Sequence, residues 1–223
     1  MTTSLFPWIT NGPLIAVQVM SGLSVGMFLF LLSVGMSLIF GVTRIVNLAH
    51  GSFYMVGAYL MAALIEVLPD SPVSFWIALV LGLSPLVAVG LWLVFYRTRW
   101  GMLVRAATID REMLGALGVD VSKLYTQVFA FGSWLAGLGG ALAAPTVAVA
   151  LGMDADVLIN AFVVVVIGGL GSFAGTLISA LLVGELQSFG ILIFPGVSIV
   201  LPFALMAVVL MIRPWGLLGE PEE

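Results

Sequence analysis

Charged residues are scarce in this chain: Asp, Glu, Lys and Arg together make up 8% of its 223 residues. Soluble domains carry about 25% of these residues, so the composition excludes a surface that faces water on all sides. Cysteine is absent, which excludes disulfides, thiolate metal sites and a cysteine nucleophile. The sequence also has no phosphate-binding GxxxxGKS/T loop and no HExxH metal motif. We therefore expect no enzyme activity, no cofactor and no metal, with energy supplied by a partner or an ion gradient.

Apolar residues are abundant instead, at 62% of the chain, with a mean hydropathy of +1.25. Several runs exceed the roughly 18 residues that mark a membrane-spanning helix, which is too many for a removable signal peptide. We predict an all-α, polytopic integral membrane helix bundle that forms a single transmembrane domain over 1–223. About seven apolar segments are expected, at 14–42, 50–68, 73–96, 125–150, 157–170, 173–192 and 195–212.

A glycine-rich break near 168–175 separates the fifth and sixth segments, which are short for complete spans. The run Gly168-Gly169-Leu170-Gly171-Ser172 predicts a broken or re-entrant hairpin, because glycine lets a shielded backbone turn and pack closely. Small residues in other segments, such as Gly22, Gly26 and those at 136–141, predict close helix packing in lipid.

All seven Lys and Arg residues fall on one face if the seven segments alternate across the membrane. Arg44 follows the first segment, five bases lie between 97 and 123, and Arg213 follows the last segment. Two linkers carry acids without bases, namely Glu66 with Asp70 and Asp154 with Asp156. The positive-inside rule then predicts a multi-pass protein of a bacterial inner membrane, with its N-terminus outside and its C-terminus cytoplasmic.

Eight of the eighteen charged residues lie between 97 and 123. Helical spacing predicts one short amphipathic helix here, with Arg105 and Glu112 opposite an apolar arc of Leu103, Ala106, Leu114 and Leu117. Gly118 predicts the end of this helix. One interpretation is a solvated connector whose bases only set topology. The mixed signs of Asp110, Arg111 and Glu112 favour the other, a protein-docking surface within a cytoplasmic coupling element at 97–124.

Polar residues at Arg44, Asn47 and His50 recur every third position between the first two apolar segments. A proton relay is one hypothesis, because ionisable groups at membrane depth are costly and tend to be functional. A single histidine without a neighbouring acid is a poor relay, so we favour a polar turn at the cytoplasmic boundary in which Asn47 or His50 caps a helix.

Asn160 begins the fifth segment and is expected to cap it, while Glu185 and Gln187 lie late in the sixth. The position of Glu185 predicts a side chain that reaches the external interface.

Several ordered motifs resemble those of one protein family, the permease subunits of bacterial ABC importers for branched-chain amino acids. They match the high-affinity permease branch better than its longer sister permease. The stretches that carry this resemblance cover most of the chain: SLIFGVTRIVNLAHGSFYMVGAYL, RAATIDREMLGALGVDVSKL, FAFGSWLAGLGGALAAP, GGLGSFAGTLISALLVGELQSFG and RPWGLLG.

The resemblance implies one half of a heterodimeric membrane channel, served by a second permease subunit, two ATPase subunits and an extracytoplasmic substrate-binding protein. The sequence alone does not decide between a heterodimer and a homodimer of permease subunits. It predicts no nucleic-acid partner. The family's ATPase docks on the region that corresponds to 97–124, so the coupling candidates are Arg105, Asp110, Arg111, Glu112 and Gly118. The candidates for the translocation path or its gate are Asn47, His50, Asn160, Gly168, Gly169 and Gly171.

One departure from the family concerns the third segment. It begins like the family's third helix and ends like its fifth within one span, so a central helical hairpin is missing near 82–87. Losing two crossings preserves orientation, and the charge pattern is therefore unaffected.

These observations together predict an importer subunit for branched-chain or other hydrophobic amino acids. Urea, amides and aromatic acids remain alternative substrates. Two other classes also remain: a gradient-driven carrier or channel, which would require ionisable residues at mid-membrane depth, and a non-transporting assembly subunit, which the missing hairpin favours.

Overall fold

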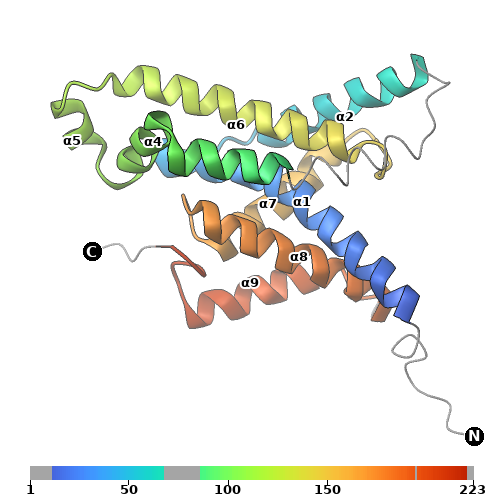
Figure 1. Ribbon diagram of the computed structural model, residues 1–223. Helices are drawn as coiled ribbons and strands as arrows, with labels where there is room; N and C mark the ends of the chain where they lie inside the picture. Colours follow the sequence, from blue (N-terminus) through green and yellow to red (C-terminus); the bar gives the residue numbers. More distant parts are fainter. Residues whose placement is uncertain (1–11, 68–85, 194, 220–223) are drawn as a thin grey trace, which may run out of the picture.

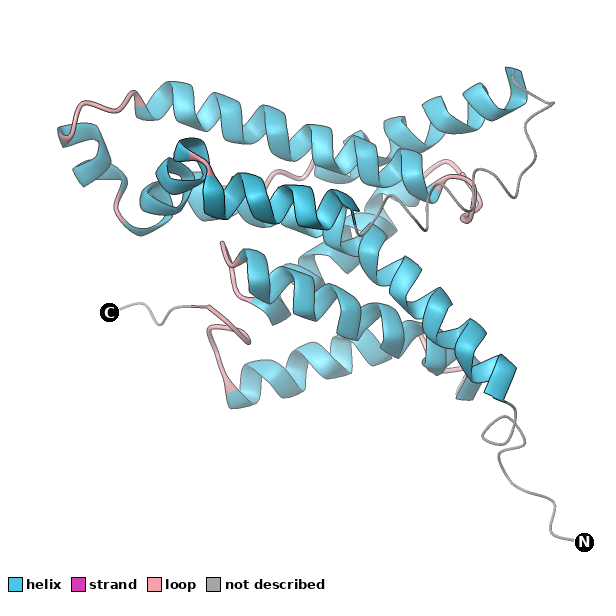
Figure 2. Cartoon of the chain, viewed as in Figure 1, coloured by secondary structure: helices cyan, strands magenta, loops and turns pink. Residues whose placement is uncertain are grey.

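The computed structural model describes residues 12–67, 86–193 and 195–219. Within these ranges every regular element is a helix, which confirms the all-α prediction (Figures 1 and 2). The elements are α1 (Gly12–Thr43), α2 (His50–Val67), a helix at Leu86–Arg97, α4 (Arg99–Ile109), α5 (Arg111–Ala116), α6 (Val121–Ala143), α7 (Met153–Gly168), α8 (Phe173–Ile193) and α9 (Leu201–Ile212).

Three of these helices, α1, α2 and α8, are long and apolar enough to cross a membrane. The helix at Leu86–Arg97 and α9 are apolar but shorter. A described helix corresponds to each of the seven predicted segments, although residues 73–85 of the third lie outside the described ranges. The chain is therefore a membrane protein built as a helix bundle.

Helix α1 is the centre of this bundle and makes its most extensive contacts with α8 and α6 (Figure 1). It is apolar on all sides, as expected of a helix enclosed by others, and Phe30, Leu31, Leu32 and Val34 are fully buried. Glycines allow the close approach: a Cβ on Gly132 would lie 2.7 Å from the Gly35 carbonyl oxygen. The packing predicted from small residues is thus confirmed in α1 and α6.

Two predicted boundaries were wrong. Helix α6 ends at Ala143 rather than near 150, because Pro145 has no backbone N–H with which to continue the helical hydrogen bonds. Helix α7 begins at Met153 rather than 157, directly after Gly152, whose φ of 87° is left-handed. Asn160 therefore lies in the second turn of α7 and does not cap it.

Candidate functional site

The charged region at 97–124 forms two helices rather than the single one predicted. Asp110 separates α4 from α5 in an extended conformation, with φ −143° and ψ 101°. Its carboxylate accepts hydrogen bonds from the backbone N–H groups of Glu112 (3.0 Å) and Met113 (2.9 Å). These are free donors at the start of α5, so Asp110 acts as its N-cap.

Gly118 ends α5, as predicted, in the left-handed conformation (φ 85°). The N–H of Val119 donates to the carbonyl of Leu114, and that of Gly118 to Gly115. This pair of bonds is the Schellman pattern that closes a helix with glycine at the first position beyond its cap. Asp110 and Gly118 thus shape the 97–124 region, and the carboxylate of Asp110 is engaged within it.

The surface of α5 carries both charge and apolar groups. Arg111 and Glu112 are exposed, as predicted, whereas the apolar arc is only partly confirmed: Leu114 is buried, but Leu117 is 73% exposed. Ile109 and Met113 are also exposed, and together with Leu117 they recur every fourth residue. We call these three side chains the apolar triad. Helical spacing placed only Leu117 on the buried arc and assigned no face to Ile109 or Met113. The extended Asp110 lies between Ile109 and Met113, so their spacing in the sequence does not by itself put them on one helix face.

Arg105 of α4 has its guanidinium carbon 4.8 Å from the centre of the Tyr96 ring. This distance is within the range of a cation–π interaction. Arg105 therefore braces α4 against the helix at Leu86–Arg97.

Helix α4 also contacts the interior of the bundle, which sequence reasoning missed. The Thr108 methyl lies where α1 meets the glycine-rich break: a Cβ on Gly171 would be 2.9 Å from it, and one on Gly41 3.4 Å. The Ser37 hydroxyl of α1 accepts a hydrogen bond from the Gly171 N–H at 3.1 Å. We call this contact of α1, α4 and the glycine-rich break the junction.

The glycine-rich break is a tight reversal between α7 and α8, as predicted. Gly169 (φ 97°) and Gly171 (φ 81°) both have positive φ, which side-chain-bearing residues rarely adopt. The last carbonyls of α7, at Ile167 and Gly168, accept hydrogen bonds from the N–H groups of Leu217 (2.8 Å) and Leu218 (3.2 Å). The segment 213–219, which follows α9, therefore satisfies helix-end groups that would otherwise lack partners.

His50 lies in the interior of the bundle and not in an exposed turn. Its Nε2 is 2.9 Å from the carbonyl oxygen of Leu32, and the side chain is fully buried. Leu32 precedes the end of α1 by eleven residues, or about 16 Å, so α2 begins well inside the bundle. The turn before α2 is closed by Asn47, whose side-chain oxygen accepts the Ala49 N–H at 3.1 Å; because Ala49 precedes the helix, this bond shapes the turn and is not a cap on the first turn of α2.

The start of α2 meets the start of α7, where the Ser52 hydroxyl donates to the Asp154 carboxylate at 3.2 Å. Further along α7, the Asn160 amide donates to the Asp156 carbonyl (3.0 Å) and its oxygen accepts from Gln187 of α8 (3.2 Å). Asn160 therefore ties α7 to α8 and is not brought together with His50 by any recorded contact.

The Lys and Arg residues lie in α4 and α5 or at the adjoining ends of α1, the helix at Leu86–Arg97, α6 and α9, and these parts lie at one end of the bundle (Figure 1). At the junction, α4 lies beside Gly41, three residues before Arg44. The 213–219 segment, which carries Arg213, contacts the α7–α8 reversal next to the junction. We call this the basic end. At the other end, α2 finishes near Glu66 (Figure 1).

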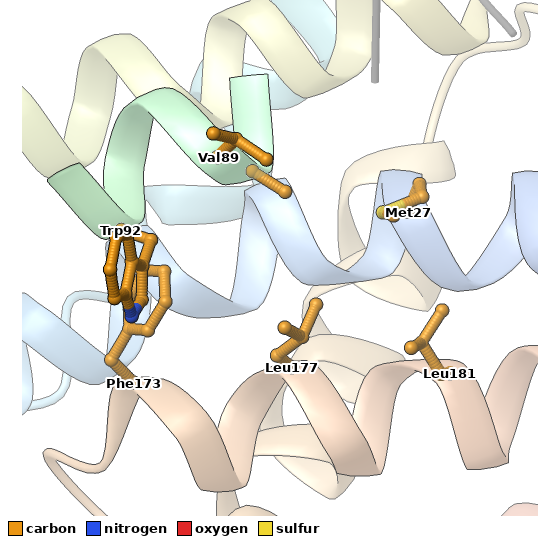
Figure 3. Close-up of a pocket in the computed structure, with 7 residues that line it drawn as sticks. Met27, Val89, Trp92, Phe173, Leu177 and Leu181 are labelled. Atoms are coloured by element: carbon orange, nitrogen blue, oxygen red, sulfur yellow. The ribbon is translucent and has the colours of Figure 1, made fainter. Parts of the chain in front are cut away.

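An apolar pocket of about 350 Å³ lies between α1, α8 and the helix at Leu86–Arg97 (Figure 3). Its wall includes Met27, Trp92, Phe173, Leu177 and Leu181. This size is at the lower end of the roughly 300–1,000 Å³ typical of small-molecule sites, and the lining suits an aliphatic group.

Comparison with known proteins gives consistent matches. Residues 18–90 and 83–210 match the family described as branched-chain amino acid transport system / permease component. The two matches meet at 83–90, the stretch where the sequence predicts the missing hairpin.

The individual relatives that match the chain are described as transport permeases. The high-affinity branched-chain amino acid transport system permease protein BraD of Pseudomonas aeruginosa is 33% identical over 160 residues, covering 67% of this chain and 50% of the relative. LivH of Escherichia coli K12, with the same description, is 31% identical over 134 residues, covering 58% and 43%. The alignments thus span about half the length of these relatives. No solved structure matches the chain.

Proposed function

The chain belongs to the branched-chain amino acid transport permease family, and from this premise we propose that it is a permease subunit of an ABC importer. Its substrate is a branched-chain or similarly hydrophobic amino acid, moved inward across a bacterial inner membrane. The single structural observation that carries the proposal is the junction: it joins the exposed α4–α5 surface directly to α1 and to the reversal between α7 and α8.

Energy for this transport comes from partners, since the sequence has no nucleotide-binding loop. The assembly comprises a second permease subunit, two ATPase subunits and an extracytoplasmic substrate-binding protein. Collecting every Lys and Arg at the basic end supports a cytoplasmic location for that end, with the N-terminus outside.

The ATPase docks on α5 and the end of α4. The apolar triad supplies the centre of the contact, and Arg111 and Glu112 flank it with charge, in keeping with an apolar interface core and a polar rim. Asp110 and Gly118 hold the two helices at the angle that presents this surface. Arg105 fixes α4 to the adjacent helix through Tyr96.

Thr108 transmits a movement of α4 to the helices that line the translocation path. Because the Thr108 methyl rests against Gly41 and Gly171, a shift of α4 displaces the reversal formed by Gly168, Gly169 and Gly171. The reversal is the gate, and closing ATPases bias it between outward- and inward-open states. Asn160, through Gln187, transmits the same shift along α8, while His50 and Asn47 fix the start of α2 beside α1.

Two observations weigh on the rival classes. The recorded hydrogen bond of His50 is to a backbone carbonyl, which supports a structural role over a proton relay, whereas the buried carboxylate oxygen of Glu185 is the ionisable feature that a gradient-driven carrier would require. The missing hairpin near 82–87, where the two family matches meet, is the feature that favours a non-transporting assembly subunit.

Uptake by the reconstituted complex separates these classes. The chain, purified with the subunits that it retains, is placed in proteoliposomes and L-leucine uptake is measured with ATP, with a proton gradient, or with neither. We expect uptake that requires ATP and the substrate-binding protein. Uptake driven by the gradient alone would identify a carrier, and no uptake under any condition would identify an assembly subunit.

A further inference from the structure

The pocket between α1, α8 and the helix at Leu86–Arg97 continues along one face of α8. Phe173, Leu177 and Leu181 line it at intervals of four residues, and Glu185 is the next residue in that series (Figure 3). Residues four apart share a helix face and are separated by about 6 Å along the axis. The Glu185 carboxylate therefore lies about one helical turn beyond the apolar pocket.

Contacts with α1 confirm that the pocket and the carboxylate follow the same seam. A Cβ on Gly26 would lie 3.0 Å from the Leu181 Cα, and one on Gly22 would lie 2.5 Å from Glu185 Oε2. Glu185 was expected to reach the external interface. Instead, it folds against α1, in the space that Gly22 leaves open.

The carboxylate has no counterion of its own. Glu185 Oε2 is buried without a hydrogen-bond partner among the described residues, and all seven Lys and Arg side chains belong to the basic end. Glu185 lies twelve residues, or about 18 Å, along α8 from that end. An ionisable side chain at this depth is costly and points to a functional partner.

An apolar pocket with a carboxylate one helical turn away defines a ligand by its chemistry. The ligand has an aliphatic body and a cationic nitrogen a few ångströms from it, as a hydrophobic α-amino acid does. Urea and amides lack the cation, and an aromatic acid without an amino group would be repelled by the carboxylate.

We propose that this seam is a substrate-binding site, in which the pocket holds the side chain of a hydrophobic amino acid and Glu185 pairs with its α-ammonium group. The inference rests on the proposed function and deepens it, since it assigns the binding of that substrate to one seam of the bundle and to a specificity-determining residue. A Glu185–ammonium bond is a charge-assisted hydrogen bond, stronger than a neutral one.

Binding to the purified complex without its substrate-binding protein tests the site. Three probes share the same aliphatic body: L-leucine, 3-methylbutylamine, which lacks the carboxylate, and 4-methylpentanoate, which lacks the ammonium group. We expect Glu185→Gln to weaken L-leucine and 3-methylbutylamine by about tenfold or more, the scale of a lost hydrogen bond to a charged group. Binding of 4-methylpentanoate should instead become tighter, because the variant removes the like charge that repels it. Glu66→Gln, at an exposed acid of α2, is the matched control and should bind all three as the wild type does.

The pocket is tested separately by Leu177→Phe, which fills part of its volume. This variant should weaken L-leucine more than L-alanine, whose side chain is smaller. If Glu185→Gln fails to assemble, the wild-type complex still decides: it must bind 3-methylbutylamine more tightly than 4-methylpentanoate.

The possible failures are distinguishable. A wild type that takes up L-leucine with ATP, together with a Glu185→Gln variant of unchanged affinity, overturns the site and leaves the proposed function standing. A wild type that moves no amino acid overturns the function itself.

Discussion

Gly168 and Gly175 pack backbone against backbone across the α7–α8 reversal, where a Cβ on Gly168 would lie 2.6 Å from the carbonyl carbon of Gly175. This spacing is shorter than any side chain tolerates, so the two helices approach to the distance that only glycine allows. The reversal is also where α4 and the 213–219 segment converge. Its geometry therefore links the membrane core to the cytoplasmic surface that we propose.

Substituting a glycine in the reversal should destabilise the fold. Gly169→Ala places a Cβ at a φ of 97° and 2.5 Å from the Gly219 nitrogen, which combines backbone strain with a steric clash. We expect a loss of about 3 kcal/mol or more, measured as a lower Tm and less monodisperse protein in detergent. Gly90→Ala, where nothing lies within 4 Å of the new Cβ, is the control; equal stability of the two variants would show that the reversal tolerates side chains.

Single cysteines should report the orientation of the chain, which has none of its own. Ser122 and Leu151 are both exposed, and they flank the two ends of α6. We expect a membrane-impermeant maleimide to label Leu151→Cys in intact spheroplasts and Ser122→Cys only after lysis. Labelling of both from the same side contradicts the proposed topology. Thr108 is unsuitable for this purpose because it packs into the junction.

Asp110 should act through capping and not through its charge. Asparagine also caps helices well, so Asp110→Asn should retain stability and ATPase binding, whereas Asp110→Ala should lose about 1 kcal/mol. The measurements are Tm and co-purification of the ATPase. A loss of ATPase binding in Asp110→Asn would instead assign the carboxylate to the docking contact.

The junction should transmit motion without contributing to docking. Thr108→Leu enlarges the side chain between Gly41 and Gly171, and overpacking of this kind costs about 1–3 kcal/mol. We expect the variant to retain its ATPases but to lose most ATP-dependent uptake. Thr108→Val, which keeps a methyl at the contact, should transport normally. If Thr108→Leu also transports normally, the coupling path does not run through this contact.

The sequence predicted the helical elements and the reversal because both rest on local properties. Long apolar runs specify helices in lipid, and Gly169 and Gly171 are needed wherever φ is positive. Gly118 was predicted as a helix end for the same reason. The prediction of a single helix within 97–124 was wrong. The apolar spacing is compatible with one helix, but Asp110 adopts an extended conformation and caps a second helix, α5.

Contacts between distant segments could not be predicted from local pattern. Nothing near Thr108 in the sequence points to Gly41 or Gly171, and the bonds from Leu217 and Leu218 to α7 cross 50 residues of chain. The position of His50 was missed because the turn at 44–49 runs back along α1, which the spacing of Arg44, Asn47 and His50 does not reveal. Glu185 was placed at the interface because Gly22 of α1, the residue that makes room for it, is 163 positions away.

The coupling of transport to ATP through α5 is tested most directly by charge reversal at Glu112, which is exposed and adjoins the apolar triad. Glu112→Lys keeps the positive-inside signal and should insert normally. Ser122→Lys, at an exposed position near the start of α6, adds positive charge at the same end as a control. The measurement is ATP hydrolysis by the co-purified complex, with and without substrate-loaded binding protein. We predict that Glu112→Lys loses its ATPase subunits and all substrate-stimulated hydrolysis while Ser122→Lys keeps both; normal retention and stimulation in Glu112→Lys would contradict the coupling role of α5.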